Sequence, residues 1–142
     1  MQKGRILAID YGNSTVGIAV SDPDRLMAFG RGSHKGLSEV DLLDKIKDLV
    51  VADNVVTVVL GLPLSSDGSD TRQTLRIRAF GSSLKEKLSE LPVEIEFLDE
   101  SFSTFEANQI LQKIGVKSAD RKQTEDEMAA IVLVHRYIDY KP

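Results

Sequence analysis

The sequence predicts an α/β fold in which a mixed sheet carries helices on its faces. Three short strand-like segments precede the first helical pattern, and helical and strand patterns then alternate. Consecutive strands at the start indicate an antiparallel meander, and the later alternation indicates parallel strands joined by crossover helices. Because such crossovers are right-handed, the first strand should lie centrally, beside the strand in "NVVTVVLGLP".

The first two strands are expected at residues 5–10 and 16–21, which are both apolar. The short segment between them is rich in turn-forming residues, so the two strands should pair as an antiparallel hairpin. A third and weaker strand is expected near residues 27–31, followed by a loop that contains three glycines, Gly30, Gly32 and Gly36.

Helical spacing begins after Ser38, a candidate N-cap. The next strand, in "NVVTVVLGLP", is apolar at nearly every position and should be covered on both faces. After the loop "SSDGSD", a second helix is expected at about residues 71–89. Its core-facing residues should be Leu75, Phe80, Leu84 and Leu88.

The segment "VEIEFLDE" alternates apolar and acidic residues, which is typical of a strand at a sheet edge. A short helix is expected at about residues 103–114. Thr124 and Glu127 then form a capping-box pattern at the start of the last helix. Along that helix, one face should carry Asp126, Ala130, Leu133 and Tyr137.

Composition narrows the range of functions. The 142 residues fit one domain, residues 1–142, and the absence of cysteine excludes disulfides and thiolate metal sites. The net charge of −4 argues against a simple electrostatic DNA-binding module. No segment resembles a signal peptide or is apolar for long enough to cross a bilayer, so a cytoplasmic protein is expected.

Three carboxylates interrupt or end elements that are otherwise apolar. Asp10 ends the first strand, Glu100 ends the last strand, and Asp126 begins the last helix. The carboxyl ends of parallel strands meet at one edge of a sheet, where α/β folds place their sites. Clustered carboxylates suit Mg²⁺ or Mn²⁺, and a carboxylate that bridges two such ions is typical of phosphodiester hydrolysis.

Each of these residues also has a purely structural interpretation. Asp10 alone is more often a turn former, and Asp126 alone is more often a helix-start charge. The loop "GLPLSSDGSD" could contact phosphate, although a plain solvated loop is the simpler interpretation. The basic residues of the second helix and of the segment before the last helix could likewise contact a nucleic-acid backbone or form only a solvated face.

Four motifs together resemble the YqgF (RuvX-type) family, which is described as Holliday junction resolvases. They are "AIDYGNSTVGIAVSD", "VVLGLPLSSDGS", "LDESFSTFEA" and "DEMAAIVLVHRYI", and they follow in order over residues 5–138. The resemblance implies a ribonuclease H-like fold with a five-stranded sheet of order 3-2-1-4-5 and helices on both faces. It also implies that the catalytic and metal-binding residues are Asp10, Glu100 and Asp126.

The resemblance implies a nuclease that uses two Mg²⁺ or Mn²⁺ ions and processes the 5′ end of pre-16S rRNA in ribosome biogenesis. The alternatives are a Holliday junction resolvase and an RNA-binding assembly factor that does not cleave. A monomer or weak dimer is expected. The expected substrate contacts are Gly12, Ser65, Asp67, Arg72, Arg76, Arg121 and Lys122.

Two positions depart from the family pattern. Ser101 stands where the family usually has arginine, and Ser65 stands where it usually has asparagine. The missing arginine removes a cation that would pair with a phosphate or with Glu100, so we expect its loss to affect substrate affinity more than metal binding.

Overall fold

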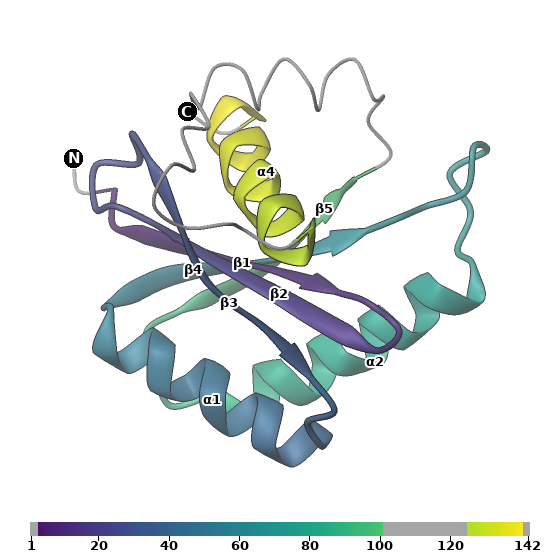
Figure 1. The fold of residues 1–142 in the computed structure, drawn as a ribbon, viewed down its shortest axis with the longest axis horizontal. Coiled ribbons are helices and arrows are strands. Elements are labelled where there is room, and N and C mark those ends of the chain that lie inside the picture. Colours follow the sequence, from purple (N-terminus) through teal and green to yellow (C-terminus); the bar gives the residue numbers. More distant parts are fainter. Residues whose placement is uncertain (1–2, 101–124, 141–142) are drawn as a thin grey trace.

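A mixed β-sheet lies at the centre of the structure, a computed structural model that describes residues 3–100 and 125–140 (Figure 1). Its elements in chain order are β1 (Arg5–Tyr11), β2 (Thr15–Ser21), β3 (Ala28–Lys35), α1 (Glu39–Ala52), β4 (Val55–Leu62), α2 (Arg72–Lys87), β5 (Glu94–Asp99) and α4 (Glu125–Tyr140). The five strands have the order β3-β2-β1-β4-β5. β2 is antiparallel to β1 and β3, whereas β4 is parallel to β1 and β5. The predicted strand order is confirmed.

The two faces of the sheet are covered by different helices. Alternate residues of a strand point to opposite faces, and on β1 this divides Leu7 and Ile9 from Ile6 and Ala8. Leu7 and Ile9 belong to the apolar core under α1 and α2, while Ile6 and Ala8 pack against α4. Figure 1 shows α4 on one side of the sheet and α1 with α2 on the other. The prediction of helices on both faces is therefore confirmed.

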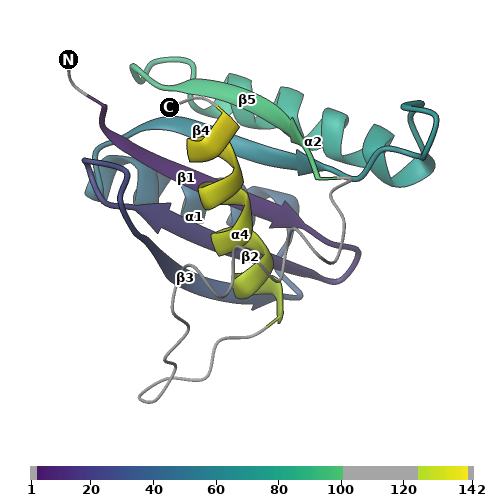
Figure 2. The ribbon, with the colours of Figure 1, turned by 90° about the horizontal axis from the view of Figure 1, so that it is seen from above.

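The start of α4 comes into direct contact with β2, and a glycine permits this contact. A Cβ atom added to Gly17 would lie 2.0 Å from the carbonyl oxygen of Asp126, so no other residue would fit there without moving the helix. Further along α4, Ala130, Leu133 and Tyr137 are buried against the sheet. Seen from above, α4 runs across β1 and β2 (Figure 2). The predicted apolar face of this helix is confirmed.

β3 is longer than expected. The sequence predicted a strand near residues 27–31 and then a glycine-containing loop, but β3 continues to Lys35 through Gly30 and Gly32. The register between β2 and β3 shifts between Gly17 and Ala19, and Gly32 has φ +102°. Glycine at this irregular position allows the edge strand to bend and continue, which explains why a segment rich in glycine still forms a ladder.

α2 presents a different face to the core from the one predicted. Leu75 was expected to be buried, yet it is 57% exposed, whereas Ile77 is only 1% exposed. Ile77, Phe80, Leu84 and Leu88 follow one another at helical spacing, and Leu75 falls outside that face. The helix is preceded by Thr71, whose side chain caps it together with Thr74.

β5 is at the edge of the sheet as predicted, with Glu94 exposed and Ile95 packed against the core. The helix expected at residues 103–114 and the N-terminal cap expected at Thr124 lie outside the described residues. None of the helices in residues 3–100 and 125–140 has the length and apolar character needed to span a membrane.

Ile77→Ala and Leu75→Ala form a matched pair on α2. We expect Ile77→Ala to lower the free energy of unfolding by about 2–4 kcal/mol, because it leaves a cavity in the core. Leu75→Ala should change it by less than about 0.5 kcal/mol, because an exposed side chain loses little on truncation. Urea unfolding followed by circular dichroism measures both, and equal losses would contradict the assigned face of α2.

Candidate active site

Asp10 lies between two strands that carry glycine at the adjacent positions. It has the same parity on β1 as Ile6 and Ala8, so its side chain is on the α4 face of the sheet. Its partner on β2 is Gly17, and on β4 Gly61 follows Leu60, the partner of Ile9. Neither neighbouring position has a side chain, so there is room beside Asp10 for groups from other elements.

Asp126 reaches this position from α4. The close contact at Gly17 brings the first turn of the helix onto β2. There, one carboxylate oxygen of Asp126, Oδ2, accepts a hydrogen bond of 2.6 Å from the hydroxyl of Thr15 and a longer one of 3.3 Å from the hydroxyl of Ser33. Asp126 is therefore held by hydroxyl groups from two strands of the sheet.

Glu100 reaches the same edge from the other side. Its N–H donates to the carbonyl of Leu62 at 3.0 Å, which continues the pairing of β4 with β5 by one residue. A Cβ atom added to Gly61 would lie 2.9–3.0 Å from the carboxyl group of Glu100. The Glu100 carboxyl thus occupies the space above Gly61, next to the position of Asp10 on β1.

The electrostatics of the site connect all three acids. Burial, with a smaller contribution from the negative charge of Asp126, raises the pKa of Asp10 from 3.8 to about 6. Burial likewise raises the pKa of Glu100 from 4.5 to about 7, with smaller contributions from Asp10 and then Asp99. Asp10 therefore interacts with a carboxylate on each side, and both interactions are repulsive.

The donor chemistry of this site suits a hard divalent cation. Carboxylate oxygens are the ligands that Mg²⁺ and Mn²⁺ prefer, and a cation would offset the repulsion around Asp10. The part of the chain that the structure describes contains no set of three or more acidic or histidine side chains placed to hold an ion together. The acids instead form two pairs that share Asp10, one with Asp126 and one with Glu100.

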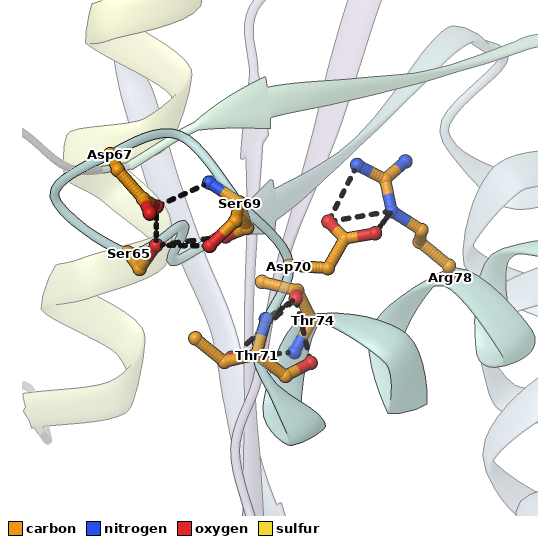
Figure 3. A network of polar contacts seen from close by, with 7 residues as sticks. All are labelled: Ser65, Asp67, Ser69, Asp70, Thr71, Thr74 and Arg78. Carbon is orange, nitrogen blue, oxygen red and sulfur yellow. Dashed lines mark hydrogen bonds and ion pairs between the residues drawn. The ribbon is translucent and has the colours of Figure 1, made fainter.

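The loop after β4 is ordered by its own side chains (Figure 3). The hydroxyl of Ser65 and the N–H of Ser69 both donate to the carboxylate of Asp67. These hydrogen bonds, with that of the Ser69 hydroxyl, lower the pKa of Asp67 to about 2. Ser65 and Asp67, both predicted substrate contacts, are therefore joined to each other in an exposed turn that projects beyond the sheet (Figure 1).

Arg76 connects α2 to the turn that follows Asp10. Its guanidinium donates to the side-chain oxygens of Asn13 and Gln73 at 2.6 Å each, and it lies 5.4 Å from the centre of the Tyr11 ring. Within the turn, the N–H of Gly12 donates to the carbonyl of Thr15 at 2.9 Å. Gly12 therefore belongs to the turn that follows Asp10, and Arg76 contacts this turn from α2, on the sheet face opposite to the one that carries the Asp10 side chain.

The other predicted contacts are less closely connected to the acids. Arg72 is exposed on the first turn of α2. Arg78, on the same helix, forms a two-pronged ion pair with Asp70 at 3.1–3.2 Å (Figure 3). Arg121 and Lys122 lie outside the described residues, as does Ser101.

Some residues of the site were not found by sequence reasoning. Gly17 and Gly61 could have been found, because glycine inside a predicted strand often marks a position that another group approaches closely. Glu127 was expected only to cap its own helix, yet its side chain is buried, and its Oε2 accepts a 2.7 Å hydrogen bond from the N–H of Gly32. That contact joins α4 to β3, which are far apart in sequence.

Comparisons with known proteins agree with this architecture. A family model, RuvX, described as Holliday junction resolvase, matches residues 4–140. A Dictyoglomus turgidum protein named "Putative pre-16S rRNA nuclease" is 36% identical over 135 residues, which is 95% of this chain and 94% of the relative. A Bacteroides fragilis protein of the same name is 34% identical over 142 residues, with 96% and 97% covered.

Among solved structures, Thermus thermophilus RuvC aligns with a TM-score of 0.65 at 12% identity, covering 96% of this chain and 95% of that one. The same protein in complex with a Holliday junction substrate aligns with a TM-score of 0.64 at 11% identity, with the same coverage. At this identity the likeness concerns the fold alone, which is ribonuclease H-like. The family match and the sequence relatives together show that this chain belongs to the RuvX (YqgF) family.

Proposed function

We propose that this protein is a divalent-metal-dependent nuclease that processes the 5′ end of pre-16S rRNA. Membership of a family of resolvases and nucleases makes the chain a phosphodiester hydrolase. The observation that carries the proposal is the position of Asp10, with the carboxyl of Glu100 above Gly61 on one side and Asp126 against Gly17 on the other. We propose that residues 1–142 form one nuclease domain.

In this proposal Asp10, Glu100 and Asp126 hold the cations. Two bound Mg²⁺ or Mn²⁺ ions would supply the Lewis acidity that activates water and stabilises the leaving oxygen of a phosphodiester. Asp10 belongs to both acidic pairs and is therefore the residue best placed to be shared between two ions. The raised pKa values of Asp10 and Glu100 supply a reason for cation binding, because bound cations would favour the charged carboxylates that burial, and to a smaller extent repulsion, disfavour.

The substrate would be held by groups around this edge of the sheet. We propose contacts to the phosphate backbone from Arg72 and Arg76 of α2, and further substrate contacts from the turn at Gly12 and the loop of Ser65 and Asp67. Arg121 and Lys122, which lie outside the described residues, are proposed as additional cations that contact the phosphate backbone. Arg76 supports this assignment most directly, since it is exposed and touches the turn that follows Asp10. Arginine is well suited to phosphate because its planar group presents several donors at once.

Ribosomal RNA is the preferred substrate because several relatives at 31–36% identity over nearly the whole chain carry the pre-16S rRNA nuclease name. A second candidate is the four-way DNA junction, which the description of the matching family favours. Symmetrical junction cleavage needs two active sites held together by a dimer. We propose a monomer or weak dimer, which suits an RNA substrate better.

Divalent cations should stabilise the native protein. We expect millimolar Mn²⁺ or Mg²⁺ at pH 7.5 to raise the melting temperature, because a ligand that binds only the folded state stabilises it. Asp10→Asn should fold and should lose this gain. Asp48→Asn, which removes an exposed carboxylate from α1 on the opposite face of the sheet, should keep it. Differential scanning calorimetry checks the prediction, and an unchanged wild-type melting temperature would favour a non-catalytic RNA-binding protein.

Without metal, stability should fall as the pH rises from about 4 to about 7. The folded pKa values of Asp10 and Glu100, about 6 and about 7, lie above their ordinary values of 3.8 and 4.5. In this window the folded state therefore holds protons that the unfolded state has released, so each unit of pH favours unfolding. The loss should be on the order of a few kcal/mol for the two groups together.

Urea unfolding in EDTA at several pH values measures this slope. Asp10→Asn should make the slope shallower, because one group no longer titrates and Glu100 loses a repulsive neighbour. The free energy of unfolding of the wild type should be compared with that of Asp10→Asn at each pH. If the difference stays constant or grows in favour of the wild type between pH 4 and 7, the two acids are not held in the repulsive arrangement described above.

Cleavage assays distinguish the candidate substrates. Precursor 16S rRNA and a synthetic four-way DNA junction should be offered in parallel to wild type, Asp10→Asn and Asp48→Asn, with Mn²⁺ and with EDTA. We expect metal-dependent cleavage at the 5′ side of the precursor, lost in Asp10→Asn and kept in Asp48→Asn. Cleavage of the junction alone would support the second candidate, and binding of RNA without any cleavage would support an assembly factor.

A further inference from the structure

Thr15 makes a short polar contact between the sheet and the last helix. It is the first residue of β2, and its hydroxyl donates to Oδ2 of Asp126 at 2.6 Å. This distance is typical of a hydroxyl that donates to a charged carboxylate, which is among the stronger hydrogen bonds in proteins. The two residues are 111 positions apart, so the contact forms only when α4 is docked on the sheet.

Thr15 also belongs to the turn that follows Asp10. Its carbonyl accepts the N–H of Gly12 at 2.9 Å, and this hydrogen bond closes the turn between β1 and β2. One residue therefore contacts the turn through its main chain and Asp126 through its side chain. A β-branched side chain in a strand has few accessible rotamers, so the direction of the Thr15 hydroxyl is well defined.

The two hydroxyl donors act on the same oxygen of Asp126. Thr15 and Ser33, from β2 and β3, both donate to Oδ2, at 2.6 and 3.3 Å. Two donors on one oxygen restrict rotation of the carboxylate and leave Oδ1 for another partner. In metal sites, carboxylates that bind an ion are commonly oriented by hydrogen bonds of this kind.

We propose that Thr15 is a positioning residue that orients the carboxylate of Asp126 for divalent-cation binding between Asp126 and Asp10, with Ser33 in a secondary role. The inference rests on the proposed function, because it assigns Thr15 a part in the same metal site. Its hydroxyl touches neither the cation nor the substrate; it acts through Asp126.

The test is a titration of the protein with Mn²⁺. Isothermal titration calorimetry and the rise in melting temperature both measure the binding. Thr15→Val removes the hydroxyl at nearly constant shape and should weaken Mn²⁺ affinity about tenfold or more. Thr15→Ser keeps a hydroxyl and should bind Mn²⁺ nearly as well as wild type. Ser33→Ala should have a smaller effect than Thr15→Val, because its hydrogen bond is longer.

Thr57→Val is the matched control. Thr57 is a buried threonine of β4, on the strand that carries Gly61, but it lies near the other end of that strand. The same change there should leave Mn²⁺ affinity unaltered. Thr15→Ala provides a second variant without the hydroxyl should Thr15→Val unfold. Cleavage by either should recover as the Mn²⁺ concentration rises, which a general loss of folding would not produce.

The outcomes separate the two proposals. If wild type binds Mn²⁺ and the hydroxyl-free variants bind it equally well, the role of Thr15 is overturned and the proposed metal-dependent nuclease stands. If Thr15→Ser is as weak as Thr15→Val, the hydroxyl is not responsible and the inference is again wrong. If wild type binds no Mn²⁺, the metal dependence fails and the role of Thr15 fails with it.

Discussion

The close contact between the first turn of α4 and β2 at Gly17 is the constraint on which the candidate site depends. It brings Asp126 onto the sheet beside Asp10, because Gly17 is the partner of Asp10 in the β1–β2 ladder. A second glycine, Gly61, leaves the space that the carboxyl of Glu100 occupies on the other side. The acidic centre is thus built by omitting two side chains from the sheet, so that groups from an edge strand and a helix can approach the central strand.

This arrangement concentrates negative charge where water is partly excluded, which is unfavourable for folding. Burial and repulsion raise the pKa values of Asp10 and Glu100. The burial of apolar side chains on both faces of the sheet, under α1 and α2 and under α4, offsets this unfavourable free energy. If the site holds divalent cations as proposed, they would be the largest local charges and would reverse these pKa shifts.

Much of the fold could be predicted from sequence because its signals are local. Apolar runs, turn residues and alternation predicted the strands, and handedness predicted the central place of β1. The predictions were wrong where tertiary packing determines which side chain is buried or where a strand ends. Leu75 and Ile77 are both apolar and close together on α2, and only the direction of the helix against the sheet determines which is buried. β3 was predicted too short because its glycines accommodate a bulge rather than end the strand.

The acids themselves were recognised because each interrupts an apolar element, but their supporting groups were not. Thr15 and Ser33 are ordinary residues in ordinary strands, and nothing in their own segments indicates a bond to Asp126. Glu127 fits a capping pattern in its own helix, so its local sequence offered no reason to predict its contact with β3. Such long-range polar contacts depend on how elements dock, and local patterns carry little information about docking.

Asp10 belongs to the first strand of the described fold, Glu100 directly follows the last strand, and Asp126 belongs to the final helix. During synthesis, α4 is made after the strands. Until it is available, Asp10 has no Asp126 beside it, and one face of the sheet lacks its apolar cover. A prematurely terminated fragment is in the same condition. If the three acids form the catalytic centre, fragments of this kind would be unable to cut the nucleic acid around them.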